Sequence, residues 1–368
     1  MSSNFHTLTV KNIQRETADT VSVSFDVPTA LKETFKYKHG QYLTLRFDIQ
    51  GEEERRAYSM SSSPLETDLV VTVKEVSGGK VSPYINRQLK VGDTVDVMPP
   101  EGRFQTKLDP EKRQTYYFFG AGSGITPLMS IIKTTLEKEP QSTLHLLYGN
   151  RNKASIIFQT QLKELEKRYA GQLTVTHVLS QPEKTKTKGI GGLFSKGKTD
   201  WDGHVGRIIP TLVERFLEEH PLRTKEADYF ICGPNAMMQS VEGHLKANGI
   251  DKKRVHLEYF TVESADKHTV SNDTTFSSAK VKVDLDGQQL EIDVPADKNI
   301  LAVMLEQKLD PPYSCTSGAC SSCMAKVVSG KTAMEVCLAL DEEEVAEGYI
   351  LTCQAHPKTP EVHITFDV

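Results

Sequence analysis

No cysteine occurs in the first 231 residues of this 368-residue chain, and no stretch approaches the roughly 18 apolar residues that a membrane-spanning helix needs. The opening MSSNFHTLTV also lacks an apolar segment behind a basic flank, which argues against a secretory signal. Apolar residues make up 38% and charged residues 25% of the chain, a balance that excludes a disordered or fibrous protein. We therefore expect a soluble, cytoplasmic protein of two or three domains with no membrane partner.

Arginine is missing from the last part of the chain. Residues 276–368 hold 7 lysines, no arginine and 15 acidic residues, a net charge of −8, whereas the rest of the chain carries +3. The total of −5 argues against nucleic acid as the main partner. The uneven distribution predicts an acidic C-terminal module joined to a slightly basic body. Its acidity suits either ordinary solubility or docking on a basic partner surface.

Five of the six cysteines fall within the last 54 residues. Cys315, Cys320 and Cys323 are followed by Cys353, and this C-x4-C-x2-C…C spacing is that of plant-type [2Fe–2S] ligation. The small residues between the ligands let the backbone wrap a cluster and point N–H groups at the sulfurs. Two alternatives remain open. One is a zinc site with four cysteine ligands. The other is that Cys337 replaces Cys353 as the fourth ligand, whereas our main interpretation of Cys337 is a small buried apolar residue.

The pattern of strands and helices changes twice along the chain. Short valine- and threonine-rich strands fill the first hundred residues, which predicts an antiparallel β-barrel. Strands then alternate with helices up to Phe260, as in a parallel α/β sheet. Beyond a Ser-, Thr-, Asp- and Lys-rich stretch come two further strands, a helix and the cysteine loop. The predicted segments are a barrel at 1–106, an α/β domain at 107–262, a linker at 263–275 and a cysteine-bearing domain at 276–368.

A lysine- and glycine-rich insertion, residues 181–203, interrupts the α/β pattern. Loops inside compact domains are usually short, and long ones lie on the surface. We interpret the insertion as a surface loop, with a partner-docking loop as the alternative.

A flavin needs a cation for its phosphate, a planar group against its ring and a polar partner near N5. Arg56, Tyr58 and Ser59 of the RAYS motif supply these groups in turn, and the motif sits on the strand predicted around Ala57–Ser61. The GGKVS motif at residues 78–82 opens a predicted helix, and glycines at a helix N-terminus suit a pyrophosphate. A plain surface strand is the alternative for RAYS, but the two motifs together favour FAD.

A second glycine-rich motif, GAGSGITP at residues 120–127, follows an apolar strand and opens a helix, as a dinucleotide pyrophosphate site requires. Pro127 suits the first helical position. Ile125 replaces the third glycine of G-x-G-x-x-G and no acidic residue ends the second strand, so a conventional NAD-dehydrogenase Rossmann domain is disfavoured. Cys232 ends a later strand in a CGP motif, at the edge where ligands bind, with a buried structural cysteine as the alternative.

With RAYS, GGKVS, GAGSGITP, CGP and C-x4-C-x2-C…C in this order, the chain resembles the ferredoxin–NADP reductase superfamily fused to a plant-type ferredoxin. Within that superfamily it is similar to reductase components of multicomponent oxygenases, through FHTLTV, GEEERRAYS, NAMM and GYILTCQAHP. The resemblance covers nearly the full length. It implies an FAD-binding barrel, an NAD(P)-binding α/β domain and a β-grasp-like [2Fe–2S] ferredoxin domain.

The resemblance also implies roles for the matching positions. Ser59 would lie near flavin N5, Cys232 near the nicotinamide and Glu258 close to the hydride path, and these three are the predicted catalytic residues. Phe260 would lie near the flavin or, alternatively, be a core aromatic. The predicted cofactor-binding residues are Arg56, Tyr58, Ser59, Gly79, Lys80, Val81, Ser82, Gly120, Gly122, Gly124, Thr126, Arg151, Cys232, Gly233, Pro234 and Phe260, and the predicted metal ligands are Cys315, Cys320, Cys323 and Cys353.

One departure from the family concerns the coenzyme. NADPH-using relatives often carry Ser-Arg after the third strand of the nucleotide domain, where this chain has Ser180-Gln181. Arg151 or the lysine-rich insertion would then bind a 2′-phosphate. The resemblance favours NADPH, and the residues alone leave NADH open.

The expected function is an NAD(P)H-dependent oxidoreductase that passes electrons through FAD and a [2Fe–2S] cluster to an oxygenase. The resemblance implies a di-iron oxygenase acting on phenylacetyl-CoA in phenylacetate degradation. Alternatives are the reductase component of another oxygenase, ring-hydroxylating or steroid, and a zinc-stabilised interaction protein. The sequence has no carboxylate–histidine cluster of the di-iron type, so we expect no oxygen activation in this chain.

Overall fold

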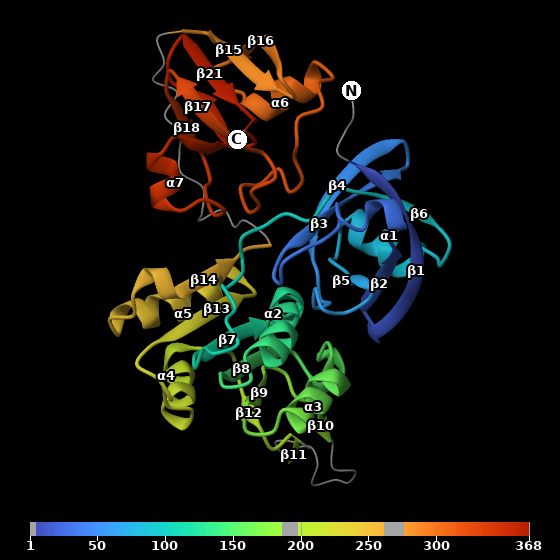
Figure 1. Cartoon of the computed structure of the whole chain (residues 1–368), viewed down its shortest axis with the longest axis vertical. Coiled ribbons are helices and arrows are strands. Elements are labelled where there is room, and N and C mark those ends of the chain that lie inside the picture. Colours follow the sequence, from blue (N-terminus) through green and yellow to red (C-terminus); the bar gives the residue numbers. More distant parts are fainter. Residues whose placement is uncertain (1–4, 186–197, 200, 261–275, 368) are drawn as a thin grey trace, which may run out of the picture.

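The computed structural model describes residues 5–185, 198–199, 201–260 and 276–367. Within these residues the chain forms three larger sheets, one after another in sequence, and two small two-stranded sheets. Figure 1 shows the three units in colour order, a blue barrel, a green-to-yellow α/β unit and an orange-to-red C-terminal unit. None of the described helices is long and apolar enough to cross a membrane.

The first unit is an antiparallel sheet in the order β4-β3-β6-β1-β2-β5, rolled into a barrel (Figure 1). Alternate side chains of its strands, such as Leu43, Leu45 and Phe47, point into one apolar core. Helix α1 (Val81–Arg87) adds Val81 and Ile85 to that core. The strands are β1 (His6–Thr17), β2 (Thr20–Asp26), β3 (Tyr42–Ile49), β4 (Glu52–Ser59), β5 (Leu69–Lys74) and β6 (Thr94–Val97).

The second unit is a parallel sheet in the order β12-β9-β8-β7-β13-β14. Its central strand β7 is buried on both faces, because Tyr116 and Phe118 belong to one core and Tyr117 and Phe119 to the other. The helices α2 (Ile125–Lys138) and α3 (Gln159–Arg168) cover the first face, and α4 (Pro210–Glu219) and α5 (Asn235–Ala247) cover the second. The strands are β7 (Thr115–Ala121), β8 (Thr143–Asn150), β9 (Leu173–Leu179), β12 (His204–Val205), β13 (Ala227–Cys232) and β14 (Val255–Glu258).

The C-terminal unit is a mixed five-stranded sheet in the order β16-β15-β21-β17-β19, with α6 (Ile300–Glu306) packed on it. The first and last strands of the unit, β15 and β21, pair in parallel, which brings its two ends together in one sheet. The long loop between α6 and β17 carries three of the cysteines, and α7 (Glu342–Ala346) lies beyond it. The strands are β15 (Ser278–Leu285), β16 (Gln288–Pro295), β17 (Met324–Ser329), β19 (Tyr349–Leu351) and β21 (Glu361–Thr365), with β18 (Thr332–Met334) and β20 (Ala355–Pro357) pairing separately.

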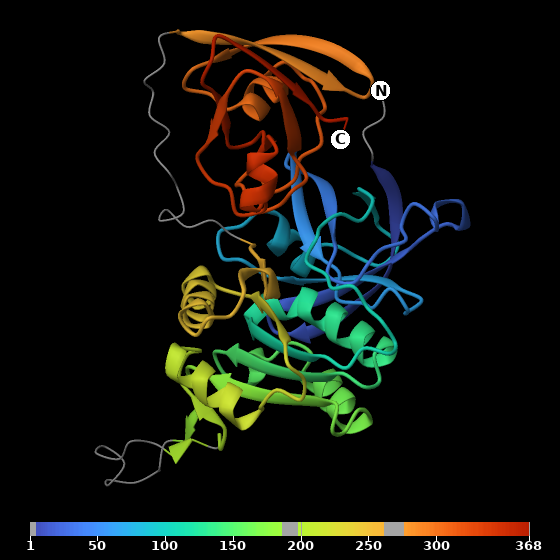
Figure 2. The same cartoon turned by 60° about the vertical axis from the view of Figure 1, so that its left-hand side comes forward.

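The C-terminal unit lies against both other units, and Figure 2 shows it stacked above the barrel and the α/β unit. Ion pairs cross the boundary between them. Arg55 of the barrel binds Asp310 at 2.8 Å, Arg103 pairs with Glu344, and Lys252 of the α/β unit binds Glu342 at 2.8 Å. The charge asymmetry of the sequence is therefore expressed at this boundary, where cations of the body face carboxylates of the acidic module.

Among the element boundaries that differ from the sequence prediction, two concern the predicted motifs. β4 begins at Glu52 rather than at Ala57, because pairing with β3 extends from Ser59 back to Glu52 and draws the charged run EEERR into the sheet. α2 begins at Ile125, so Pro127 is its third residue instead of its first. The predicted linker at 263–275 lies outside the described residues, as does the middle of the 181–203 insertion, whose ends form the short pair β10 (Lys184–Thr185) and β11 (Lys198–Thr199).

Candidate functional site

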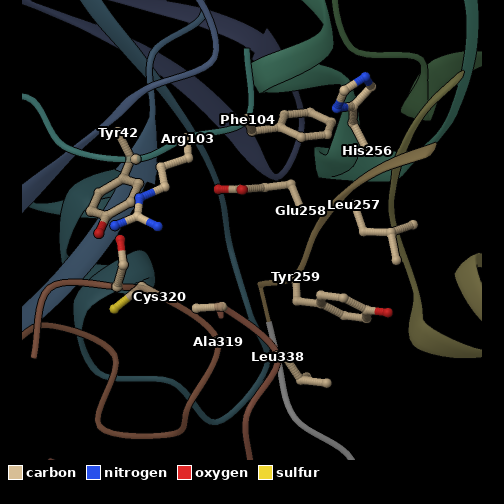
Figure 3. Close-up of a pocket in the computed structure, with 13 residues that line it drawn as sticks. Tyr42, Arg103, Phe104, His256, Leu257, Glu258, Tyr259, Ala319, Cys320 and Leu338 are labelled. Atoms are coloured by element: carbon tan, nitrogen blue, oxygen red, sulfur yellow. The ribbon is translucent and has the colours of Figure 1, made fainter. Parts of the chain in front are cut away.

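A cavity of about 160 Å³ opens where the three units meet. Ser59 of β4, Glu258 of β14 and Cys320 of the cysteine loop all line it. A neighbouring cavity, drawn in Figure 3, shares Tyr42, Glu258 and Cys320 with the first. In that view Glu258 projects from its strand toward Tyr42 and Arg103, while the hydroxyl end of Tyr42 faces the loop that carries Cys320. Residues predicted to serve three different cofactors therefore share one connected site.

The barrel side of the site contains a buried hydroxyl that is ready to bind a polar group. Ser59 Oγ is 4% exposed at the residue level and has no hydrogen-bond partner among the described residues. A buried polar atom without a partner is costly, so a bound group that hydrogen-bonds it is favoured. The position fits the predicted contact with flavin N5. Tyr58 is partly buried and packs against the apolar core of the barrel, and its placement on a flavin ring stays a prediction.

Two cations of the predicted phosphate site converge on a single carboxylate. Arg56 and Lys80 each bind Glu54 at 2.9 Å. The turn before α1 carries Gly79, where an added Cβ would lie only 3.2 Å from Val76 O and 3.3 Å from Ser82 Oγ. Ser82 Oγ in turn accepts the backbone N–H of Val76 at 3.0 Å, which fixes this turn. The cations and the tight turn fit an anionic phosphate group.

The second glycine motif is folded against the CGP motif at the carboxyl edge of the parallel sheet. Cys232 pairs in register with Gly120 of β7 on one side and with Glu258 of β14 on the other. A Cβ on Gly124 would lie 2.0 Å from Cys232 O, so only glycine allows the two turns to meet there. Gly122 adopts a positive φ of 55° beside them. The carboxyl edge of such a sheet is where nucleotides bind, and the N-terminus of α2 faces it.

The predicted catalytic residues of this edge differ in access. Cys232 is fully buried, and burial raises the pKa of its thiol well above the ordinary value. Glu258 lines the cavity, and the surrounding protein raises the pKa of its carboxyl to about 8 by removing water from it. A carboxyl with this pKa is mostly protonated at neutral pH. Phe260 is 38% exposed and lines the same cavity, so it is not a core aromatic.

Arg151, the candidate for a 2′-phosphate, lies at the end of β8 and is 60% exposed along its side chain. It binds Asp19 of the barrel at 3.1 Å, and Lys74 lies 3.7 Å from the same carboxylate. Any phosphate bound by Arg151 therefore competes with Asp19, a contact that the sequence did not indicate.

The predicted cluster ligands lie together on the C-terminal unit. Cys320, Cys323 and Cys353 are 8%, 2% and 3% exposed, and Cys315 is half-buried. All four are free thiols. Thr316 and Gly318 adopt positive φ angles of 54° and 82°, and a Cβ on Gly318 would lie 2.9 Å from Val336 O. These left-handed positions curl the loop so that its sulfurs face inward.

The four thiols form two pairs. Cys315 lies within hydrogen-bonding reach of Cys320, and Cys323 within reach of Cys353. Among the described residues no three His, Cys, Asp or Glu side chains gather closely enough to hold one metal ion. Two pairs suit two bridged irons, each held by two thiolates, better than one tetrahedral zinc. Cys337 packs at the edge of the small apolar cluster that encloses Cys323 and Cys353.

Backbone and side-chain donors point at the sulfurs of the site. The N–H of Ser317 donates to Cys315 Sγ at 3.4 Å, and Gln354 Nε2 donates to Cys353 Sγ at 3.7 Å. Hydrogen bonds of this kind stabilise thiolates bound to iron. The chemistry of the donor set thus fits a [2Fe–2S] cluster.

Several residues of the site had no signal in the sequence. Tyr42 lines both cavities, Arg55 is a buried guanidinium that holds Asp310, and Glu101 and Arg103 reach the cysteine loop and its neighbours. Each acts on a partner more than two hundred residues away in sequence. Only the position of Arg55, directly before the RAYS motif, could have drawn notice.

Three family models match the chain. They are an oxidoreductase FAD-binding domain at residues 7–106, an oxidoreductase NAD-binding domain at residues 118–196 and a 2Fe-2S iron-sulfur cluster binding domain at residues 283–358. The predicted cofactor classes FAD, nicotinamide nucleotide and [2Fe–2S] are confirmed by these matches. So is the order of the units along the chain.

Two curated relatives are similar over almost their whole length. One component of 1,2-phenylacetyl-CoA epoxidase from Escherichia coli (strain K12) is 38% identical over 99% of this chain and 98% of its own. The ferredoxin reductase component of 3-ketosteroid-9-alpha-monooxygenase from Rhodococcus rhodochrous is 37% identical over 98% of this chain and 96% of its own. The resemblance to oxygenase reductases drawn from the motifs is confirmed.

Solved structures share the arrangement of all three units. Phthalate dioxygenase reductase aligns with a TM-score of 0.55 at 22% identity, over 98% of both chains. An intact type IV self-sufficient cytochrome P450 monooxygenase aligns with a TM-score of 0.68 at 20% identity, over 98% of this chain and 41% of that one. At these identities the likeness concerns the fold alone, and it confirms the predicted fold class.

The Glu258 carboxyl predicts a specific pH dependence of stability. Its pKa is about 8 in the folded protein and near the ordinary 4.5 once unfolded, so the folded state holds more protons between these values. The unfolding free energy of the wild type should therefore fall with rising pH across this window, relative to Glu258→Gln, by up to about 1.4 kcal/mol per pH unit. Above about pH 8 the difference should level off. Urea unfolding at a series of pH values measures it.

The control for this experiment is Glu218→Gln, which removes a carboxyl from the exposed side of α4. If the Glu258→Gln and wild-type curves keep a constant separation from pH 5 to pH 8, the pKa of the Glu258 carboxyl is not raised as described.

Proposed function

The chain belongs to the flavin- and iron–sulfur-containing reductases that occur as oxygenase components, and from this premise we propose that it supplies electrons to the oxygenase component of a multicomponent oxygenase. It is an oxidoreductase with FAD-binding, NAD-binding and 2Fe-2S domains. The cofactors of these domains, when bound, supply hydride transfer from a reduced nicotinamide to the flavin and transfer of single electrons to the cluster. The observation that carries the proposal is the shared cavity, which Ser59, Glu258 and Cys320 line together.

The finer proposal is that the partner is a di-iron oxygenase acting on phenylacetyl-CoA, in phenylacetate degradation. Its support is the similarity to the Escherichia coli 1,2-phenylacetyl-CoA epoxidase component over nearly the whole of both chains. The ketosteroid monooxygenase reductase is almost as similar, and a steroid oxygenase is therefore the second candidate. We place the reaction in the cytoplasm. We favour NADPH as the electron donor because the chain resembles the ferredoxin–NADP reductase superfamily.

In the proposed site the barrel and the α/β unit hold the two nucleotides. Arg56, Lys80 and the Gly79–Ser82 turn bind the FAD phosphates, and Ser59 Oγ donates a hydrogen bond toward N5. Gly120, Gly122, Gly124 and Thr126 bind the nicotinamide nucleotide with Cys232, Gly233 and Pro234. The remaining proposed cofactor contacts are Tyr58, Val81, Arg151 and Phe260.

Glu258 has a defined part in this proposal. A carboxyl that stays protonated at neutral pH leaves the cavity without a negative charge next to the reacting groups, and its O–H can donate a hydrogen bond. Cys232 lies one strand away and, being fully buried and protonated, serves as an apolar wall of the nicotinamide site.

The cluster ligands in the proposal are Cys315 and Cys320 for one iron and Cys323 and Cys353 for the other. The two thiol pairs support this division. The proposed domain boundaries are 1–106, 107–262 and 276–368 with a linker at 263–275, and their support is that each of the three larger sheets falls within one of these ranges.

Replacing one proposed cluster ligand tests the cluster site independently of the flavin site. Cys353→Ser should lose the [2Fe–2S] spectrum yet keep FAD and its reduction by NADPH, because the flavin and nucleotide residues lie on the other two units. Cys337→Ser, its matched control, should keep the cluster. Visible absorption, iron analysis and anaerobic NADPH bleaching of the flavin measure both. A cluster that survives in Cys353→Ser and is lost in Cys337→Ser would transfer the fourth-ligand role to Cys337.

Reconstitution with purified oxygenase components tests the partner. With a phenylacetyl-CoA epoxidase oxygenase, NADPH consumption should rise several-fold on addition of phenylacetyl-CoA and should match epoxide formation. A ketosteroid monooxygenase oxygenase and its steroid form the comparison arm, and NADH replaces NADPH in parallel. Turnover only in the steroid arm would overturn the finer proposal, and reduction of an artificial acceptor without turnover of any oxygenase would overturn the partner proposal as a whole.

A further inference from the structure

A hydrogen-bonded chain of three side chains joins the barrel to the cysteine loop. Tyr42 of β3 and Ser322 of the loop share a hydrogen bond of 2.9 Å, although 280 residues separate them in sequence. Ser322 Oγ donates to Glu101 Oε2 at 2.8 Å, and the Tyr42 hydroxyl lies 3.4 Å from the same oxygen. With Ser322 donating to the carboxylate, the Tyr42 O–H donates to Ser322. Both ends of this chain belong to the barrel unit, and its middle belongs to the C-terminal unit.

The position of Tyr42 connects the chain to both redox sites. The residue is 4% exposed and lines the cavity that Ser59 and Cys320 share. Its hydroxyl faces the cysteine loop in Figure 3. Ser322, which directly precedes the proposed ligand Cys323, is 5% exposed. Tyr42 therefore stands between the proposed flavin and cluster sites and touches the loop next to a cluster ligand.

The other contacts across the boundary are weaker candidates for fixing this loop. Lys252 and Glu342, which are 68% and 90% exposed, form an ion pair that solvent and salt screen. Arg55 and Asp310 bind at 2.8 Å beside Tyr313 and hold the start of the loop, five residues before Cys315, rather than the segment around Cys323. The Tyr42–Ser322–Glu101 chain is buried at the loop itself, where unsatisfied partners are costly.

We propose that Tyr42 is a positioning residue that acts through Ser322 and Glu101 to fix the cysteine loop against the flavin cavity, and thereby sets the rate at which electrons pass from the flavin to the cluster. The inference rests on the proposed flavin-to-cluster route. It assigns no new redox step, because one electron leaves the flavin and one enters the cluster as before. What changes with Tyr42 is the fraction of time that the loop spends in the docked position.

The decisive variant is Tyr42→Phe, which keeps the ring and removes only the hydroxyl. Loss of a buried hydrogen bond of this kind should lower the equilibrium constant between docked and undocked loop about tenfold. In anaerobic stopped-flow mixing with NADPH, the ratio of the cluster-reduction rate to the flavin-reduction rate should fall, by at most the same factor. The matched control is Tyr37→Phe, because Tyr37 and Ser62 form a similar bond of 2.7 Å wholly inside the barrel unit.

Two further measurements separate positioning from general stability. Hydrogen–deuterium exchange on the full chain should be faster at residues 315–323 in Tyr42→Phe and unchanged there in Tyr37→Phe, a readout that needs no turnover. In a double-mutant cycle, Ser322→Ala combined with Tyr42→Phe should lower the rate ratio by less than the product of the two separate effects, because each change removes the Tyr42–Ser322 bond that they share.

The outcomes distinguish the inference from the proposed function. An unchanged rate ratio in Tyr42→Phe, an equal fall in Tyr37→Phe, or additive effects of Tyr42→Phe and Ser322→Ala would each overturn the inference while leaving the route in place. If the wild type reduces its flavin and never its cluster, the proposed function fails and the inference fails with it.

Discussion

The contact between the cysteine loop and the cavity lined by Ser59, the proposed flavin site, is the constraint on which the rest of the structure depends. Electrons move between two sites only when those sites lie close together, and here the two sites belong to units that are distant in sequence. Ser59 and Cys320 line one cavity because the C-terminal unit lies against the barrel. Arg55, Arg103 and Lys252 bind carboxylates of the acidic module, so the charge asymmetry of the chain favours this arrangement.

The parallel sheet supplies the third participant at the same place. Its carboxyl edge brings together Gly120, Cys232 and Glu258 in register, and Glu258 reaches from that edge into the shared cavity. The close approach at Gly124 leaves no room for a side chain. The proposed nicotinamide, flavin and cluster sites thus share one cavity, and each is built by a different unit. Removal of water by the surrounding protein raises the pKa of the Glu258 carboxyl to about 8, which favours its protonated, uncharged form in the cavity.

The sequence predicted the features that depend on neighbouring residues, and it missed those that depend on distant ones. The cysteine spacing, the glycine turns and the alternation of strand and helix are local patterns, and each identified its unit correctly. The strand start at Glu52 was missed because the first five residues of β4 are all charged, which is not a pattern typical of a strand. The extent of β4 is determined instead by its pairing with β3. Tyr42 and Arg55 carry no local signal, since their partners Ser322 and Asp310 lie in another unit. The individual cofactor and cluster contacts remain proposals that rest on this geometry.

An anaerobic titration of the purified full-length chain with NADPH tests the central claim most directly, namely that electrons from the nicotinamide reach the cluster through the flavin within one chain. Absorption of the oxidised flavin and of the oxidised [2Fe–2S] cluster is followed together as NADPH is added. The account predicts that both absorptions disappear without any added mediator. Complete bleaching of the flavin beside a cluster that stays oxidised under excess NADPH, in a protein shown to contain iron and sulfide, would contradict it.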